Sequence, residues 1–500
     1  GSRHAVALVA AVLLASLLVS PARAAIYTWT GAATGGDWTT DSNWDLTGFP
    51  NAADADAQLV YDFTGTSPRV DLRQDITVNA IHYNDNGGGT DSQLQINNAS
   101  GETYKLIFSG SAPEVHSLSG SGHGLRVIAP IDVSAAGLTK TGSGVAQLYT
   151  ITGGSGVDIR LSGGSLEVSG ESPNFSGDFV VDSGRRFEAR SVSGPGANVL
   201  GNTTGATIIN GNGYFEFRDT SGKTTSEPFV LNGINAGTGS IKCYAGGNNT
   251  INGPVTLNSD SSFSVGDWTS GTVGAKRVFF IDSVIADGTG GPHNVYFLGD
   301  FNSTSAQGTE GRKSEMILRA QSTYGGDTYL TTDKANAAPT DLFSGNLRVG
   351  IDNPLPIGTT LTLGGSHTTA GGTLGTGAGN GKFALGGYSQ ELAGLLTNGT
   401  STQNRVVGNS PTLSTLTLNI ASGTNTYDGY LGWTDTDDNN LALLKTGAGT
   451  LVLSAANTYE GTTTVTAGVL AITDPTALGS AAARTTVANY ASLEVSGGIT

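Results

Sequence analysis

The sequence predicts an all-β protein whose short strands coil into a β-solenoid, and three observations lead to this fold class. Glycine contributes 75 of the 500 residues while charged residues make up only 13%, a composition typical of a chain with many tight turns. Apolar residues alternate at positions i and i+2, which is the period of a strand. One sequence pattern also recurs along the chain, which is typical of repeat architectures.

The first 24 residues are predicted to be a secretory signal peptide. An apolar run from 5 to 19 follows Arg3, and a small-x-small cleavage pattern ends at Ala24. The run is short for a membrane span, which takes about 20 residues. We therefore expect cleavage after Ala24, export of the chain, and a location at the cell surface or outside the cell.

Residues 25–100 are predicted to form an N-terminal cap and the first, irregular coils. Three of the five tryptophans, Trp29, Trp38 and Trp44, fall within this segment. Every solenoid needs an atypical terminal unit, and large aromatic side chains are suited to close its apolar end. The alternative is that the tryptophans form a flat surface on which sugars stack.

Residues 101–500 are predicted to form the solenoid itself. The stretch 138–144 reads Leu-Thr-Lys-Thr-Gly-Ser-Gly and matches Leu-Leu-Lys-Thr-Gly-Ala-Gly at 443–449. The best copy of the repeat covers 443–472, and two partial copies cover 138–168 and 316–349. We expect strands in and after the best copy at Leu451/Leu453, Val465, Leu470/Ile472, Val487 and Leu493/Val495.

The spacing of these strands favours a solenoid over a sandwich or a barrel. Successive strands are so close in sequence that two or three fit into a coil of roughly 20 to 25 residues, and coils stack at about 4.8 Å. The chain would then make about 20 coils and a rod near 100 Å long. The sequence stops at residue 500 in the middle of the recurring pattern, so we expect the solenoid to continue beyond it.

The best copy resembles the autotransporter-associated β-strand repeat of bacterial passenger domains. Residues 443–472 contain Lys-Thr-Gly-x-Gly-Thr-Leu-x-Leu followed by Asn-Thr-Tyr-x-Gly-Thr-Thr-x-Val. The resemblance implies a right-handed parallel β-helix whose repeat is associated with moving passengers across the outer membrane. It also implies a partner in the outer-membrane export machinery, or a barrel, outside this fragment, and it carries over no catalytic residues.

Charge and cysteine content exclude other classes. The net charge is −16, which argues against nucleic acid as a partner because such binding needs clustered lysine and arginine. A single cysteine, Cys243, excludes a disulfide framework and a CxxC zinc site within the chain. We expect Cys243 to be a small core residue.

Three segments with notable patterns have simple structural interpretations. Asp435–Asn440 offers oxygen atoms at calcium-like spacing, but an EF-hand loop needs Gly and Glu where Asn440 and Thr446 stand, so we favour a solvated acidic turn. Gly375–Gly381 resembles a phosphate-binding loop only superficially, because no helical pattern follows it, and it is interpreted as a turn. Asp71, Arg73 and Asp75 alternate with apolar residues, which predicts the exposed outer face of one strand.

An enzyme of the polysaccharide-cleaving β-helix type would need carboxylates, or carboxylates with Lys or Arg, on adjacent coils. We find isolated acids in turns, at Asp282, Asp287 and Asp327, and no recurring column of acids. The histidines are scattered, at His82, His116, His123, His293 and His367. The sequence therefore predicts no catalytic, cofactor-binding or metal-binding residues, and no cofactor.

The predicted function is that of a non-catalytic surface spacer or adhesin. Such a protein needs only stacking and solubility, and it presents a recognition surface to glycans or to other cells. The alternative is a polysaccharide lyase or hydrolase built on a β-helix.

Overall fold

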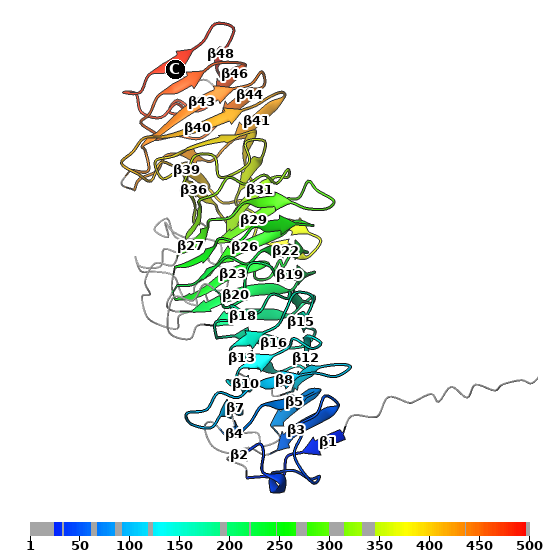
Figure 1. Ribbon diagram of the computed structural model, residues 1–500. Helices are drawn as coiled ribbons and strands as arrows, with labels where there is room; N and C mark the ends of the chain where they lie inside the picture. Colours follow the sequence, from blue (N-terminus) through cyan, green and yellow to red (C-terminus); the bar gives the residue numbers. More distant parts are fainter. Residues whose placement is uncertain are drawn as a thin grey trace, which may run out of the picture.

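A computed structural model describes residues 25–32, 35–61, 68–85, 93–118, 124–190, 198–219, 222–246, 248–266, 278–299, 315–332, 346–435 and 437–496. Within these residues the chain is a long rod of stacked strands, with β1 near one end and β48 at the other (Figure 1). The one helical turn described is a short 3-10 helix, η1 (Asp41–Asn43). The predicted all-β parallel β-helix is confirmed. The predicted signal peptide lies outside the described residues.

Three long sheets, numbered 1, 2 and 4 below, run along the rod. Sheet 1 has eleven strands: β1 (Ala25–Thr28), β3 (Ala55–Tyr61), β6 (Ala80–Asp85), β9 (Glu114–Ser117), β12 (Leu138–Thr141), β15 (Ile159–Leu161), β17 (Phe179–Val181), β19 (Thr207–Asn210), β22 (Phe229–Asn232), β25 (Val255–Leu257) and β28 (Ile285–Asp287). Sheet 2 has fourteen: β2 (Gly35–Asp37), β4 (Arg69–Leu72), β7 (Gln95–Asn98), β10 (Leu125–Val127), β13 (Val145–Leu148), β16 (Ser165–Val168), β18 (Arg186–Arg190), β20 (Tyr214–Asp219), β23 (Ile241–Gly246), β26 (Ser261–Val265), β29 (Val295–Gly299), β31 (Thr328–Thr332), β33 (Thr360–Leu363) and β38 (Gly394–Thr397).

Sheet 3 forms the third side of the first coils, and sheet 4 forms it later in the chain. Sheet 3 contains β5 (Ile76–Val78), β8 (Leu106–Phe108), β11 (Ile131–Asp132) and β14 (Ile151–Thr152). Sheet 4 contains β21 (Thr224–Thr225), β24 (Asn249–Ile251), β27 (Val278–Ile281), β30 (Glu315–Leu318), β32 (Asn346–Val349), β36 (Lys382–Ala384), β39 (Arg405–Val407) and β42 (Tyr430–Leu431).

Two smaller sheets complete the C-terminal coils. Sheet 5 contains β37 (Ser389–Leu392), β40 (Ser414–Asn419), β43 (Leu441–Thr446), β45 (Thr463–Val465) and β47 (Thr485–Val487). Sheet 6 contains β41 (Thr424–Tyr427), β44 (Thr450–Leu453), β46 (Val469–Ile472) and β48 (Ser492–Val495). The strands expected in and after the best repeat copy are therefore present as β44, β45, β46, β47 and β48.

Neighbouring strands within these sheets pair in parallel, so each pair is one turn of the coil. Ile159 pairs with Phe179, 20 residues later, and Leu443 likewise pairs with Thr463. These coils have the predicted length. Other coils are longer because residues are inserted between strands, and the pairing of Ile281 with Leu318 spans 37 residues.

A continuous apolar core fills the inside of the coil. Alternation along each strand sends one set of side chains inward, and phenylalanines from successive coils stack there. Phe179 contacts Phe187 at 4.7 Å between ring centroids, and Phe215 contacts Phe229 at 5.2 Å. All four rings are buried, and each contributes roughly 1.5 to 3 kcal/mol of hydrophobic stabilisation.

The lysine of the repeat has an unexpected position, because it points into the core. Lys445 pairs in register with Val465, and both side chains are buried. Its Nζ atom donates to the carbonyl oxygens of Thr446 (2.7 Å), Gly447 (2.9 Å) and Ala467 (3.2 Å). The stem thus fills the core, and the ammonium group ties the turn of its own coil to the next coil.

The other copy of the motif repeats this arrangement. Lys140 is buried, and its Nζ donates to the carbonyl oxygens of Thr141, Gly142 (3.3 Å) and Gly163 (3.1 Å). Burial lowers the pKa of Lys140 to about 8, so the amino group is still mostly protonated at pH 7. The match between 138–144 and 443–449 therefore reflects one structural device.

The tyrosine of the repeat is a second recurring device. Tyr459 is buried and its hydroxyl lies 2.5 Å from Thr463 Oγ1. Tyr324 is buried in the same way, with its hydroxyl 2.6 Å from Thr328 Oγ1. In both copies the hydroxyl finds its partner four residues later, so the buried ring carries no unsatisfied polar group.

One hairpin departs from the solenoid and was not predicted. Strands β34 (His367–Thr369) and β35 (Gly372–Leu374) pair antiparallel and fold back over the outer face of sheet 2. Leu374 belongs there to a small apolar cluster with Ile234, Ala236, Tyr296 and Leu298. The segment from Gly375 to Gly381 follows as a turn before β36, as expected.

The tryptophans of the N-terminal segment lie inside the first coils. Trp29, Trp38 and Trp44 are 1%, 0% and 4% exposed, and Trp44 packs against the other two with centroids 5.2 and 5.1 Å away. Buried rings offer no flat surface to a sugar, which favours the capping interpretation.

The charges near residue 70 correct one expectation. Val70 and Leu72 are buried on β4, as the alternation predicts. The strand ends at Leu72, however, so Arg73 and Asp75 lie in the following turn. Arg73 pairs there with Asp37 of the preceding coil at 3.1 Å, because the turn brings its long side chain back over the neighbouring coil.

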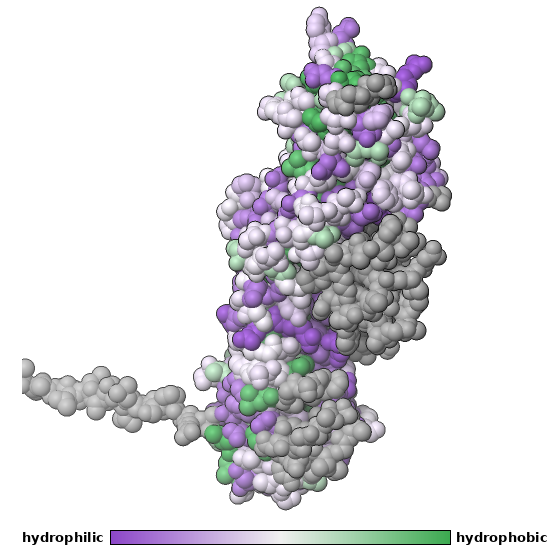
Figure 2. All heavy atoms as spheres, turned by 180° about the vertical axis from the view of Figure 1, so that it is seen from behind, coloured by the Kyte–Doolittle hydropathy of each residue, from purple (hydrophilic) through white to green (hydrophobic). Residues whose placement is uncertain are grey.

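The coloured part of the face seen in Figure 2 is mostly polar or neutral in hydropathy. Near the C-terminal end of the described residues, the apolar or aromatic side chains of Val487, Tyr490 and Val495 are exposed. In the described residues no helix is long and apolar enough to cross a membrane. Cys243 is buried in β23 as a core residue, as predicted.

Candidate functional site

A column of charged side chains follows the outer face of sheet 2 and is the first candidate site. Glu167 of β16 pairs in register with Glu188 of β18, which pairs with Glu216 of β20. The column begins at Gln147 and continues to Lys242. Three glutamates thus stand on three consecutive coils.

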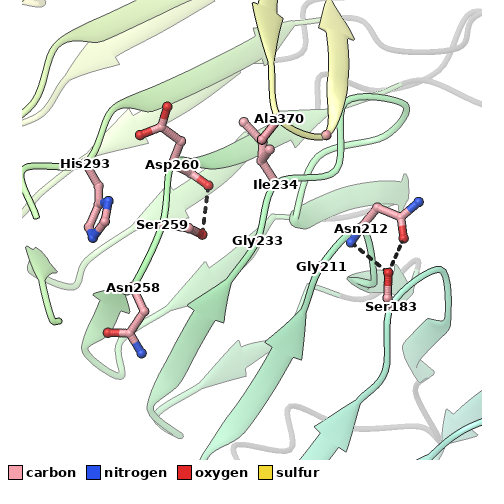
Figure 3. A pocket seen from close by; sticks show the side chains of 11 residues that line it. Ser183, Gly211, Asn212, Gly233, Ile234, Asn258, Ser259, Asp260, His293 and Ala370 are labelled. Atoms are coloured by element: carbon pink, nitrogen blue, oxygen red, sulfur yellow. Dashed lines mark hydrogen bonds between the residues drawn. The ribbon is translucent and has the colours of Figure 1, made fainter. Parts of the chain in front are cut away.

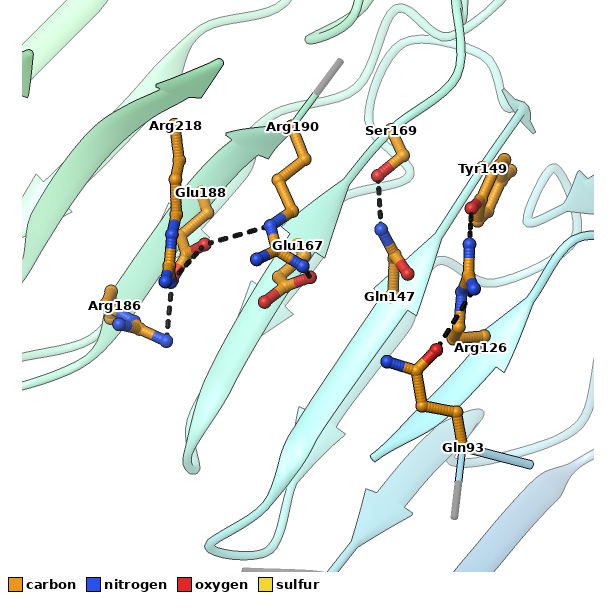
Figure 4. A network of polar contacts seen from close by, with 10 residues as sticks. All are labelled: Gln93, Arg126, Gln147, Tyr149, Glu167, Ser169, Arg186, Glu188, Arg190 and Arg218. Carbon is orange, nitrogen blue, oxygen red and sulfur yellow. Dashed lines mark hydrogen bonds and ion pairs between the residues drawn. The ribbon is translucent and has the colours of Figure 1, made fainter. Parts of the chain in front are cut away.

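Arginines hold this column together (Figure 4). The Arg190 guanidinium contacts Glu167 Oε2 at 2.9 Å and Glu188 Oε2 at 3.7 Å. Arg186 contacts Glu188 Oε1 at 2.6 Å, and Arg218 contacts the same carboxylate at 3.3 Å. The Glu188 side chain is fully buried, and three guanidinium groups compensate its charge.

Burial dominates the titration of the other two glutamates. It raises the pKa of Glu216 to about 7, although Lys242 opposes the shift. Burial also raises the pKa of Glu167, and the neighbouring Glu188 charge adds to the shift. The Glu216 Oε1 atom is buried without a hydrogen-bond partner, which is the environment that favours a protonated carboxyl.

This column corrects the expectation that acids do not recur on adjacent coils. The signal was present in the sequence, because Ser-Leu-Glu-Val at 165–168, Arg-Phe-Glu-Ala at 186–189 and Tyr-Phe-Glu-Phe at 214–217 share one pattern. Parallel strands in register place the third residue of each pattern directly above the previous one. The separations of 21 and 28 residues differ, so the column has no single fixed spacing in the sequence.

The chemistry of the column is that of a buried ion network. Carboxylates on adjacent coils are one requirement for polysaccharide cleavage. A general acid must also reach the glycosidic oxygen of its substrate, and these carboxyl groups are enclosed, with residue exposures of 4% for Glu167, 0% for Glu188 and 2% for Glu216. Enclosure and arginine pairing favour a structural role.

The isolated acids predicted in turns are cross-coil contacts. Asp282 binds Arg319 at 2.6 and 2.7 Å. Asp287 accepts from the backbone N–H of Gly325 at 2.7 Å, and Asp327 accepts from that of Thr360 at 3.1 Å.

The acidic segment Asp435–Asn440 is not a solvated turn, which corrects that expectation. Asp438 is fully buried, with its Oδ2 3.4 Å from Lys382 Nζ, and Asp435 Oδ2 lies 3.7 Å from the same atom. The segment lies against Lys382 and the buried Arg405 on sheet 4, because two cations there need negative charge. Burial lowers the pKa of Lys382, and Asp438 opposes that shift.

The histidines fall at separate places. His82 and His116 pair in register on sheet 1, with ring centroids 5.5 Å apart. His293 lines the groove described below, and the ring of His367 lies on the hairpin with its centroid 4.7 Å from that of Tyr329. His123 is outside the described residues. No group of three or more His, Cys, Asp or Glu side chains that could hold a metal occurs in the described part of the chain.

The second candidate site is a groove of about 660 Å³ at the corner between sheets 1 and 2 (Figure 3). Turns of successive coils form its floor, and the hairpin tip forms a wall. Its lining residues are Ser183, Gly211, Asn212, Gly233, Ile234, Asn258, Ser259, Asp260, His293, Ala370 and Gly371. We call it the corner groove.

An asparagine ladder runs beside the floor of the corner groove, and one of its members, Asn258, lines the groove. Asn232 Nδ2 donates to Asn210 Oδ1 at 2.9 Å, and Asn258 Nδ2 donates to Asn232 Oδ1 at 2.8 Å. The backbone N–H of Thr289 donates to Asn258 Oδ1 at 2.8 Å. The same contact thus recurs from coil to coil and sets the positions of the turns.

The sequence did not predict the corner groove. Its residues come from turns spread between residues 183 and 293 and from a hairpin near residue 370. The asparagine that recurs at the ends of three successive strands of sheet 1, β19, β22 and β25, was a usable signal for the turns of the floor. No local pattern shows that the hairpin folds back over these coils.

Comparison with known proteins supports the interpretation of the repeat. Residues 443–472 match the family described as passenger-associated-transport-repeat. A stretch of 131 residues is 35% identical to a protein named Adhesin BmaC autotransporter from Brucella suis biovar 1 (strain 1330). The chain carries an autotransporter passenger repeat. The resemblance predicted from residues 443–472 is therefore confirmed, and so is the prediction of an exported, cell-surface protein.

The extent of these matches is limited. The aligned stretch is 26% of this passenger chain and 3% of the Brucella adhesin. No solved structure gives a significant match to the chain.

Proposed function

We propose that this passenger chain is a non-enzymatic adhesin that holds a recognition surface for glycans or other cells away from the bacterium. The match of residues 443–472 to the passenger transport repeat carries the proposal. The parallel stack supports it, because a rod of coils gives reach without requiring a catalytic site. The similarity to a protein named an adhesin is further support. The outer-membrane export machinery is the second proposed partner.

Adhesion of protein-coated microspheres tests this function. Spheres carrying the purified chain are incubated with epithelial and bacterial cells, and bound spheres are counted against spheres carrying albumin. We expect adhesion that falls after the cells are treated with periodate, which destroys sugar rings. Adhesion no greater than that of albumin would contradict the adhesin role, and adhesion insensitive to periodate would contradict glycan recognition.

One observation, the glutamate column, supports the alternative of a polysaccharide lyase or hydrolase. An enzyme of this class would release unsaturated or reducing sugar ends from a polysaccharide panel, and Glu167→Gln, Glu188→Gln or Glu216→Gln would abolish the release. We expect no release. Release that one of these substitutions removes would replace the adhesin proposal with the enzyme.

A further inference from the structure

We propose that the corner groove binds a neutral oligosaccharide laid along the rod. The inference rests on the proposed recognition of glycans and assigns it to one place. The volume of about 660 Å³ is in the range of small-ligand sites, which is roughly 300 to 1,000 Å³. The floor repeats with the coil spacing of about 4.8 Å, close to the length of one pyranose unit, so successive sugars would meet successive turns.

The groove is rigidly framed, which favours binding because little order has to be gained. The hairpin wall is anchored by Leu374 in its apolar cluster and by the stacked rings of Tyr296 and Tyr329, whose centroids are 4.6 Å apart. At the hairpin tip, Gly371 lies so close to the floor that a Cβ atom there would stand 2.1 Å from the Ile234 carbonyl oxygen.

The lining offers the groups that bind sugar hydroxyls. Asn212 is exposed, and its Oδ1 accepts from Ser183 Oγ at 2.7 Å. Asp260 accepts from the backbone N–H of Asn294 at 2.8 Å and from its side chain at 3.2 Å, which leaves further lone pairs for a ligand because each carboxylate oxygen accepts more than one bond. Ile234 and Ala370 supply apolar contact for the faces of the sugar rings.

The charge of the groove selects against anionic glycans. Among the described residues, its lining contains the Asp260 carboxylate and no lysine or arginine. Placing a sialic acid carboxylate there would bring two like charges together without a compensating cation. The occupant is therefore an uncharged oligosaccharide.

The test uses an array of neutral oligosaccharides, each paired with its sialylated form, such as lactose and 3′-sialyllactose. We expect the full chain to bind at least one neutral member and to bind its sialylated partner at least tenfold more weakly. Ala370→Trp fills the groove from the hairpin tip and should weaken binding at least tenfold. Thr368→Trp places the same bulk on an exposed position of the same hairpin outside the groove, and it should stay within twofold of the unchanged chain.

Asp260→Asn tests the charge argument separately, and it should narrow the gap between neutral and sialylated ligands. Glycan binding unaffected by Ala370→Trp would overturn the groove assignment while leaving the adhesin proposal in place. Preference for sialylated ligands would overturn the charge argument. If the coated spheres adhere to cells but the array binds no glycan, this inference alone is overturned. If the array binds a glycan but the spheres do not adhere to cells, only the proposed cell recognition is overturned.

Discussion

At the scale of single residues, a buried lysine explains why two copies of the repeat form the same turn. Lys445 and Lys140 each donate to three backbone carbonyls, two in their own turn and one in the next coil. An apolar side chain of similar length would also fill the core, but it would leave those carbonyls without their donor. The lysine therefore links the core to the turn.

Lys445→Met keeps the apolar stem and removes the ammonium group. We expect it to lower the free energy of unfolding by about 1 to 3 kcal/mol, because buried acceptors lose their partner. Urea unfolding followed by circular dichroism measures the change. Arg484→Met alters an exposed cation in the same region and serves as the control, and equal stability of the two variants would contradict the role assigned to Lys445.

Glu216 gives a prediction for pH dependence. Its pKa is about 7 in the folded protein against an ordinary 4.5, so the folded chain holds more protons than the unfolded chain between these values. The stability that the protonated carboxyl contributes is present below about pH 4.5 and is lost as the pH rises through 7. We expect the unchanged chain to lose more stability between pH 5 and pH 8 than Glu216→Gln, by up to about 3 kcal/mol.

Thermal unfolding at the two pH values measures this difference. The matched control is Glu494→Gln, because Glu494 is also the third residue of its strand but lies on an exposed strand, Ser492–Val495. It should leave the pH dependence unchanged. The same pH dependence in Glu216→Gln and in the unchanged chain would show that Glu216 ionises normally.

At the scale of the element, the turn after the lysine explains why glycine follows the Lys-Thr pair. Gly142 and Gly447 have the same left-handed φ of +73°. A Cβ atom at Gly447 would lie 2.3 Å from the Ile420 carbonyl oxygen of the preceding coil. The turn thus needs glycine for its conformation and for the close approach of the two coils.

Substitutions at two glycines separate these two requirements. Gly423→Ala introduces only the left-handed conformation, since φ is +69° and nothing lies near the added Cβ, and it should cost about 1 to 2 kcal/mol. Gly447→Ala adds the clash with backbone and should cost clearly more. Urea unfolding of both variants measures the costs, and equal values would show that the coils separate easily at this point.

At the scale of the whole molecule, the parallel stack determines the shape. Sheet 2 contributes 14 strands and sheet 6 four more, with β38 lying against β41, so eighteen coils follow one another in the described residues. At about 4.8 Å per coil the stack is roughly 80 Å long. This is somewhat shorter than the rod predicted from the sequence because inserted residues lengthen individual coils.

Small-angle scattering of the purified chain tests this shape. We expect a skewed distance distribution with a tail that reaches at least roughly 80 Å, and far-UV circular dichroism with helix below about a tenth of the residues. A symmetric distribution typical of a sphere would contradict the stack.

The sequence by itself determined the fold class, the strands of the best repeat copy and the burial of Cys243. These features depend on local period and turn chemistry, which neighbouring residues specify. The sequence also contained the glutamate pattern and the asparagines of the ladder beside the groove floor. Their alignment was not visible because coil lengths vary from 19 to 37 residues, and only the strand register shows which residues lie above one another.

Tertiary structure alone decided the remaining features of the candidate sites. The hairpin at 367–374 folds back onto coils more than 70 residues earlier in the chain, at Ile234 and Tyr296, and the acidic segment near Asp438 lies on Lys382. Both contacts depend on which surface a protruding segment can cover with apolar contact or opposite charge. These contacts join parts of the chain that are far apart in sequence, so no local sequence pattern predicts them.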